Sequence, residues 1–171
     1  MSNTVRKKHS LVNHRRALFI LMFAEYLILL IYFLFFSEIF GRTVAFSEYR
    51  YNFEPFAEIK RYCTDMRNKN YLMFFINIVG NIVLFMPFGF LFPYVCEKEN
   101  FRTGRFFLAT LFATFVFVLA IETIQLVTKV GVFDVDDIIM NTFGSVMGYI
   151  LYRIIRRNRI KTKKEQGTGN G

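Results

Sequence analysis

The chain has 171 residues, of which 54% are hydrophobic, and it contains 23 Phe, 9 Tyr and no Trp. Its mean hydropathy is positive, at +0.33, which excludes an ordinary water-soluble domain. The formal net charge of +9 would suit nucleic-acid binding if Lys and Arg were spread over a folded surface. They lie instead at the chain ends and between apolar blocks, as in membrane proteins, so we predict no nucleic-acid partner.

Four apolar blocks are long enough to cross a membrane as helices, at residues 17–36, 72–95, 106–127 and 138–155. At a rise of about 1.5 Å per residue, the first covers about 30 Å, the thickness of a hydrocarbon core. The fourth is the least apolar, because it contains Asn141 and Arg153, yet it still covers about 27 Å. We therefore predict an all-α polytopic membrane protein whose residues 17–155 form a bundle of four transmembrane helices.

The distribution of Lys and Arg predicts the orientation of these spans. Five of the 22 basic residues precede the first span, three lie between the second and third, and seven lie at or after the end of the fourth. Because cytoplasmic segments carry the excess of Lys and Arg, we expect both termini in the cytoplasm of a bacterial cell, with basic tails at 1–16 and 156–171. The second tail is too poor in apolar residues to fold alone, and we predict that it is disordered.

The loop between the first two spans is rich in aromatic residues and is expected to lie on the outer membrane surface. Pro55 suits the first turn of a helix. After it, Phe56, Ile59 and Met66 recur at helical spacing, with Lys and Arg between them. We therefore predict a short interfacial amphipathic helix in this first outer loop.

Amide and carboxyl side chains occur inside the predicted spans, where polar groups are costly and usually mark function. Asn77 and Asn81 share one face of the second span, and Glu122 and Gln125 share one face of the third. Asn141 lies one turn into the fourth span. Given the predicted orientation, three helices place polar groups at one level in the outer half of the membrane.

Glycine and proline near this level indicate close packing or a bend. Gly144 and Gly148 form a GxxxG pair, which lets another helix approach closely. Pro87 lies inside the second span, where it removes an amide donor and is expected to kink the helix. The kink either opens a cavity from the outside or serves packing alone, and the sequence favours neither.

Four acidic residues gather near the predicted outer face: Glu122, Asp134, Asp136 and Asp137. Like charges this close repel one another unless a cation lies between them. Such a cation is a basic residue of the outer loops, a metal ion or a cationic ligand. Hydrogen bonding between helices is an alternative explanation for the polar groups, but it does not require four carboxyl groups. We therefore favour a site for a ligand or a partner.

Glu25 is a separate case, because it lies about 13 Å into the first span, near the middle of the membrane. A carboxyl group at that depth is expected to be neutral or paired. Proton coupling in a transporter would use such a group. We favour a simple hydrogen bond to Asn81 or to another helix.

Three motifs resemble the VanZ-like family of bacterial membrane proteins. Residues 52–56 are similar to the family's Asn-x-x-Pro-Phe element, and residues 77–89 to its helix with asparagine, proline and glycine. The third motif resembles the family signature E-x-x-Q, D-x-x-D and N-x-x-G, at residues 122–125, 134–137 and 141–144. Before the first aspartate the chain departs from the family pattern, because it lacks the arginine found there.

The resemblance implies resistance to glycopeptide antibiotics of the teicoplanin type. We expect a non-catalytic, outward-facing polar site without a cofactor, whose partner is the antibiotic, a lipid-linked cell-wall precursor or another envelope protein. Two alternatives remain: a metal-dependent enzyme acting on envelope lipid phosphates through the three aspartates, and a proton-coupled exporter that uses Glu25 and Glu122. The candidate site comprises Asn52, Pro55, Phe56, Asn77, Asn81, Pro87, Glu122, Gln125, Asp134, Asp136, Asp137, Asn141 and Gly144.

Overall fold

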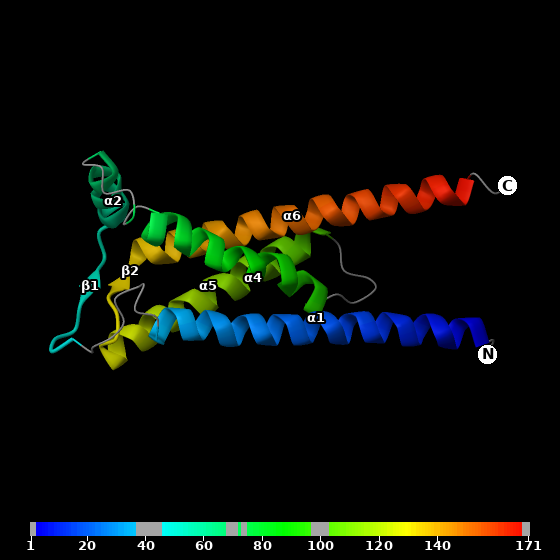
Figure 1. Ribbon diagram of the computed structural model, residues 1–171, viewed down its shortest axis with the longest axis horizontal. Helices are drawn as coiled ribbons and strands as arrows, with labels where there is room; N and C mark the ends of the chain where they lie inside the picture. Colours follow the sequence, from blue (N-terminus) through cyan, green and yellow to red (C-terminus); the bar gives the residue numbers. More distant parts are fainter. Residues whose placement is uncertain (1–2, 37–45, 68–71, 73–74, 97–102, 169–171) are drawn as a thin grey trace.

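A computed structural model describes residues 3–36, 46–67, 72, 75–96 and 103–168 (Figure 1). The long helices are α1 (Asn3–Phe36), α4 (Gly80–Cys96), α5 (Thr103–Thr128) and α6 (Val135–Thr168). The shorter elements are the strands β1 (Tyr51–Asn52) and β2 (Phe133–Asp134), the helix α2 (Ala57–Arg67) and the π-helix η2 (Phe75–Val79). The predicted all-α fold is therefore confirmed.

Four helices are long and apolar enough to cross a membrane, at His14–Phe36, Asn77–Cys96, Arg105–Thr128 and Val135–Asn158. They match the four predicted spans. Many of their large hydrophobic side chains are exposed on the outside of the bundle, such as Leu21, Ile28 and Phe112. In a bilayer these faces contact lipid, which has no polar groups to offer, so the chain is a multi-pass membrane protein.

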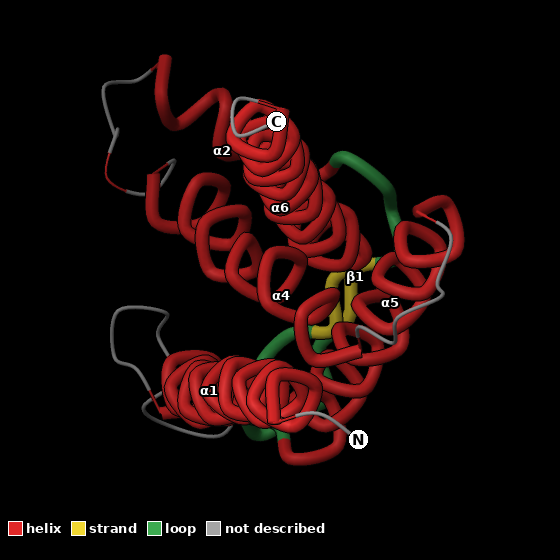
Figure 2. The backbone as a smooth tube through the Cα atoms, turned by 90° about the vertical axis from the view of Figure 1, so that its right-hand side faces the viewer, coloured by secondary structure: helices red, strands yellow, loops and turns green. Residues whose placement is uncertain are grey.

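Among the described residues, the most extensive helix contact joins α4 to α6, which lie side by side in both views (Figures 1 and 2). A Cβ atom added to Gly144 would overlap the backbone carbonyl of Ile82, and one added to Gly148 would overlap that of Met86. The predicted close approach at this glycine pair is thus confirmed. The approach fixes the start of α6 against α4, and it thereby positions the acidic residues that open α6.

Two predicted boundaries differ from the structure. The sequence predicts a second span from residue 72, whereas the π-helix η2 precedes α4 and the candidate span begins at Asn77. Short π-helical turns are frequent at functional sites. The fourth span begins earlier than predicted, because Asp134 caps the first turn of α6.

The disorder predicted for residues 156–171 is wrong as far as Thr168, because α6 continues to that residue. Lys, Arg, Glu and Gln have high helix propensity, and a helix anchored by a packed span needs no new nucleation to add residues. Residues 169–171 lie outside the described residues.

The two short strands and α2 gather at one end of the bundle, which we call the strand end, while α1 begins and α6 ends at the opposite end (Figure 1). β1 and β2 pair in parallel, with Asn52 beside Asp134. The Phe133 amide also donates to the Arg50 carbonyl at 3.0 Å. The sequence predicted α2 but not this pairing, which joins segments about 80 residues apart.

Candidate functional site

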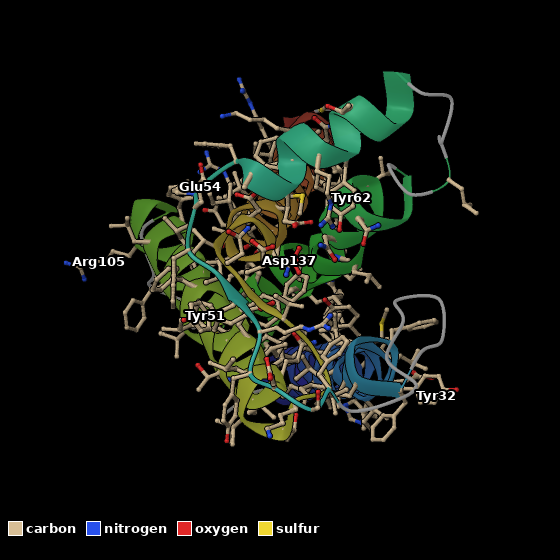
Figure 3. All side chains as sticks on the ribbon, turned by 90° about the vertical axis from the view of Figure 1, so that its left-hand side faces the viewer. Tyr32, Tyr51, Glu54, Tyr62, Arg105 and Asp137 are labelled. Atoms are coloured by element: carbon tan, nitrogen blue, oxygen red, sulfur yellow. The ribbon has the colours of Figure 1, made fainter. Side chains whose placement is uncertain are left out.

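A cavity of about 370 Å³ lies at the strand end. Its lining combines three acidic side chains, one arginine, two amides and several aromatic rings. It is formed by Phe46, Tyr51, Asn52, Glu58, Arg61, Tyr62, Asn77, Val130, Val132, Asp134 and Asp137. Figure 3 looks onto this end, with Asp137 between Tyr62 of α2 and Tyr51 of β1. Four of the sequence-predicted site residues thus converge on one cavity.

Asp134 stands at the junction of β2 and α6. Its Oδ1 accepts a hydrogen bond from the Asp136 amide at 2.8 Å, the geometry of a helix N-cap. Asn52 Nδ2 lies 3.4 Å from both carboxyl oxygens, and the Asp134 amide donates to Glu122 Oε2 at 3.1 Å. Burial raises the pKa of the Asp134 carboxyl, while the bonds from Asp136 and Asn52 act in the opposite direction.

Asp136 does not line the cavity but anchors α2. Its side chain is fully buried, and its two oxygens accept hydrogen bonds from the amides of Phe56, at 2.5 Å, and Ile59, at 3.1 Å. These amides belong to the start of α2, where the helix dipole favours an anion. Phe56 has a φ of 66°, an uncommon conformation for a bulky residue, which turns the chain into α2 after Pro55.

Asp137 faces the cavity from the first turn of α6. Its Oδ1 accepts a hydrogen bond from Asn81 Nδ2 at 2.7 Å, which joins α6 to α4. Asn77, one turn earlier in η2, also lines the cavity. Both asparagines of the predicted i, i+4 pair therefore lie near Asp137, because Asn81 bonds to it and Asn77 lines the same cavity.

α2 covers one side of the cavity with Glu58, Arg61 and Tyr62. Glu58 and Arg61 form an ion pair, and the Arg61 guanidinium lies 5.0 Å from the centre of the Tyr62 ring. Burial raises the pKa of Tyr62 to about 12, so its hydroxyl keeps its proton at neutral pH. The sequence prediction included Arg61 only as a candidate cation of the outer loops and missed Glu58 and Tyr62, although the i, i+3 and i, i+4 spacing of the three residues already placed them on one face of α2.

The remaining predicted site residues lie elsewhere. Gln125 Nε2 donates to the Leu34 carbonyl at 3.0 Å and joins α5 to α1. Asn141 is buried within α6, and its Oδ1 has no hydrogen-bond partner. Pro87 lies inside α4, Pro55 is exposed before α2, and Gly144 lies in the helix contact. None of these residues lines the cavity.

Arg61, one of the outer-loop basic residues expected to balance the acids, lines the cavity with Asp134 and Asp137. Buried Asp134, Asp136 and Glu122 are held by amide donors, and the ion pair between Arg61 and Glu58 lies on α2. Lys129, a candidate cation, donates instead to the Ser47 carbonyl at 3.0 Å. Within the described ranges, no three carboxyl, imidazole or thiol groups are placed to hold one metal ion.

Glu25 also differs from its prediction. Asn81, its expected partner, donates to Asp137. The Glu25 side chain is exposed on the outside of the bundle. The Glu25 carboxyl group therefore does not join the polar groups inside the bundle.

Four membrane-length helices with a polar cavity at one end define a multi-pass membrane protein with a candidate binding site. The model of the VanZ/LLP1 family matches residues 23–156, which include every residue that lines the cavity, and the chain belongs to that family. It is similar to Protein VanZ of Enterococcus faecium, with 28% identity over 92 residues, or 54% of this chain and 53% of that protein. The chain thus spans about half the length of this curated relative. No solved structure matches it.

Proposed function

We propose that the cavity at the strand end is a non-catalytic binding site that faces the outside of a bacterial cell and lowers susceptibility to glycopeptide antibiotics of the teicoplanin type. The observation that carries the proposal is the convergence of Asn52, Asn77, Asp134 and Asp137 on one cavity of about 370 Å³. Cavities of this size, with a few convergent polar groups, are typical ligand sites. The link to glycopeptides rests on family membership.

The lining indicates what kind of ligand the site accepts. Among the described residues of the lining, Glu58, Asp134 and Asp137 outnumber Arg61 as the charged groups, and aromatic rings lie beside them. Carboxylates accept hydrogen bonds, and aromatic faces attract cations. The site therefore favours a donor-rich or positively charged group on the antibiotic, a lipid-linked cell-wall precursor or another envelope protein.

The enzymatic and exporter alternatives have less support. A site built from three aspartates would need Asp136, whose two oxygens already accept hydrogen bonds from α2. An exporter using Glu25 and Glu122 would need them on one path, whereas Glu25 is exposed on the outside of the bundle and Glu122 is buried at the strand end. We therefore propose a binding role.

The outward orientation predicts the labelling of two cysteines. Cys63 is exposed on α2, and Cys96 ends α4 at the opposite end of the bundle. We expect an impermeant maleimide to label Cys63 on intact cells and to reach Cys96 only after permeabilisation. Cys63→Ser and Cys96→Ser variants identify each signal. The reverse pattern would place the cavity in the cytoplasm and refute an outward site.

The binding role predicts the effect of cavity variants on resistance. In a strain protected by the wild-type protein, Asp137→Asn and Asn77→Ala should lower the minimum inhibitory concentration of teicoplanin toward that of the strain without the protein. Glu48→Gln is the matched control, because Glu48 is exposed near the same end but does not line the cavity. Unchanged protection by normally expressed cavity variants would refute the role of this site.

A further inference from the structure

Glu25 has no explanation within the fold. It lies in the middle of the candidate span His14–Phe36, and its side chain is exposed on the outer surface of the bundle. Across the part of the chain that the structure describes, no side chain forms a hydrogen bond or an ion pair with it. In a bilayer that surface faces lipid, which cannot satisfy a carboxyl group. Because the described part of the chain offers no partner, we look for one outside this chain.

The residues around Glu25 form a regular seam along α1. Leu18, Leu21, Glu25, Ile28 and Tyr32 follow one another at alternating spacings of three and four residues. Two of these residues precede Glu25 and two follow it. The exposed fractions of Leu18, Leu21, Ile28 and Tyr32 are 57%, 67%, 69% and 56%. A mean spacing of 3.5 residues is that of the a and d positions of a left-handed coiled coil. Figure 2 shows α1 at the edge of the bundle.

We propose that this seam is the dimer interface of the protein, with α1 of one copy packed in parallel against α1 of a second copy. Two copies inserted with the same orientation are related by an axis along the membrane normal, so equivalent residues of the seam meet at the same depth. Glu25 of one copy then faces Glu25 of the other. The interface does not involve the cavity and does not depend on the proposed function.

The hydrogen-bonding chemistry of the carboxyl group favours a second copy of this protein as the partner of the seam. A neutral carboxyl group carries one donor and at least one acceptor, so two of them form a closed pair of hydrogen bonds. Such bonds between helices stabilise association inside a membrane. Within the four candidate spans, Lys and Arg lie only near the ends. A second copy therefore offers no cation at the depth of Glu25, and the two Glu25 carboxyl groups pair with each other.

Energy transfer between two labelled pools of the full-length protein in liposomes tests the proposal. The wild type should dimerise, and Glu25→Gln should dimerise within about twofold of it, because an amide keeps a donor and an acceptor. Glu25→Leu keeps an apolar seam but loses the hydrogen bonds, and its dimerisation should weaken about tenfold. A wild type that stays monomeric at every protein-to-lipid ratio, or equal dimerisation of the leucine variant, would overturn the proposal.

Cysteine cross-linking tests the seam geometry without altering Glu25. The background carries Cys63→Ala and Cys96→Ala, and single cysteines replace Ile28 or Ile20. Both positions are exposed on α1, at 69% and 43%, but Ile20 lies about 120° around the helix from the centre of the seam. Oxidation in membranes should link Ile28→Cys into dimers and leave Ile20→Cys monomeric. Equal linking at Ile28→Cys and Ile20→Cys, or no linking at Ile28→Cys, would contradict the seam.

Discussion

Replacement of Asp136 by alanine is expected to lower the free energy of unfolding by about 3 kcal/mol, because two hydrogen bonds to a charged acceptor disappear. The amides of Phe56 and Ile59 then lose the anion that the start of α2 faces. We expect α2 to detach from α6 and the cavity to lose one side. Unfolding of the protein in micelles measures the first effect, and faster trypsin cleavage at Lys60 and Arg61 measures the second.

Two variants control this prediction. Asp136→Asn keeps one acceptor oxygen, so its loss of stability should be about half that of the alanine variant. Glu48→Gln changes an exposed carboxyl group at the same end and should alter stability by less than about 0.5 kcal/mol. Wild-type stability and slow cleavage of α2 in the alanine variant would show that Asp136 does not anchor this helix.

The second large effect concerns Gly144, where α6 contacts α4. Gly144→Ala places a methyl group where the Ile82 backbone carbonyl lies, and neither backbone can move without separating the two helices. We expect a loss of about 3 kcal/mol in the free energy of unfolding, the upper range for overpacking a core. The same unfolding measurement in micelles tests it.

The neighbouring residue gives a matched control for Gly144. Phe143 is 54% exposed on the outside of α6, so Phe143→Ala should change the free energy of unfolding by less than about 1 kcal/mol. A Gly144→Ala protein as stable as the wild type would mean that α4 and α6 do not pack this closely.

These structural roles affect how loss of resistance is interpreted. Variants of Asp136 or Gly144 remove an anchor or a helix contact, so a susceptible strain carrying them would say little about ligand binding. Asp137 and Asn77 line the cavity directly, and their variants test binding. Stability measured beside resistance separates the two kinds of effect.

The four spans, the amphipathic helix in the first loop and the close approach at Gly144 were predictable, because each depends on residues near one another in the chain. The length of an apolar block decides whether it spans a bilayer, and a four-residue spacing of glycines brings two small residues onto one face. The π-helix of η2 was not predictable, since no local pattern required it.

The separate roles of Asp134, Asp136 and Asp137 could not be predicted from the sequence. Three neighbouring acids look equivalent in a motif, yet Asp134 caps α6, Asp136 anchors α2 and Asp137 meets Asn81. Neighbouring residues of a helix point about 100° apart, so their partners depend on which distant segment lies on each side. Here residues 52–59, about 80 positions away, supply the partners of Asp134 and Asp136, whereas Asn81 of α4 is the partner of Asp137.

Composition and local spacing therefore determined that this chain is a four-span membrane protein with polar groups gathered near one end. Only the tertiary structure decided which of those groups share a cavity and which of them cap helices. It also decided that the Glu25 side chain lies on the outside of the bundle. The physical reason is that hydrophobic length and periodicity act along the chain, whereas the direction of a side chain becomes a contact only when helices and strands from distant positions pack together.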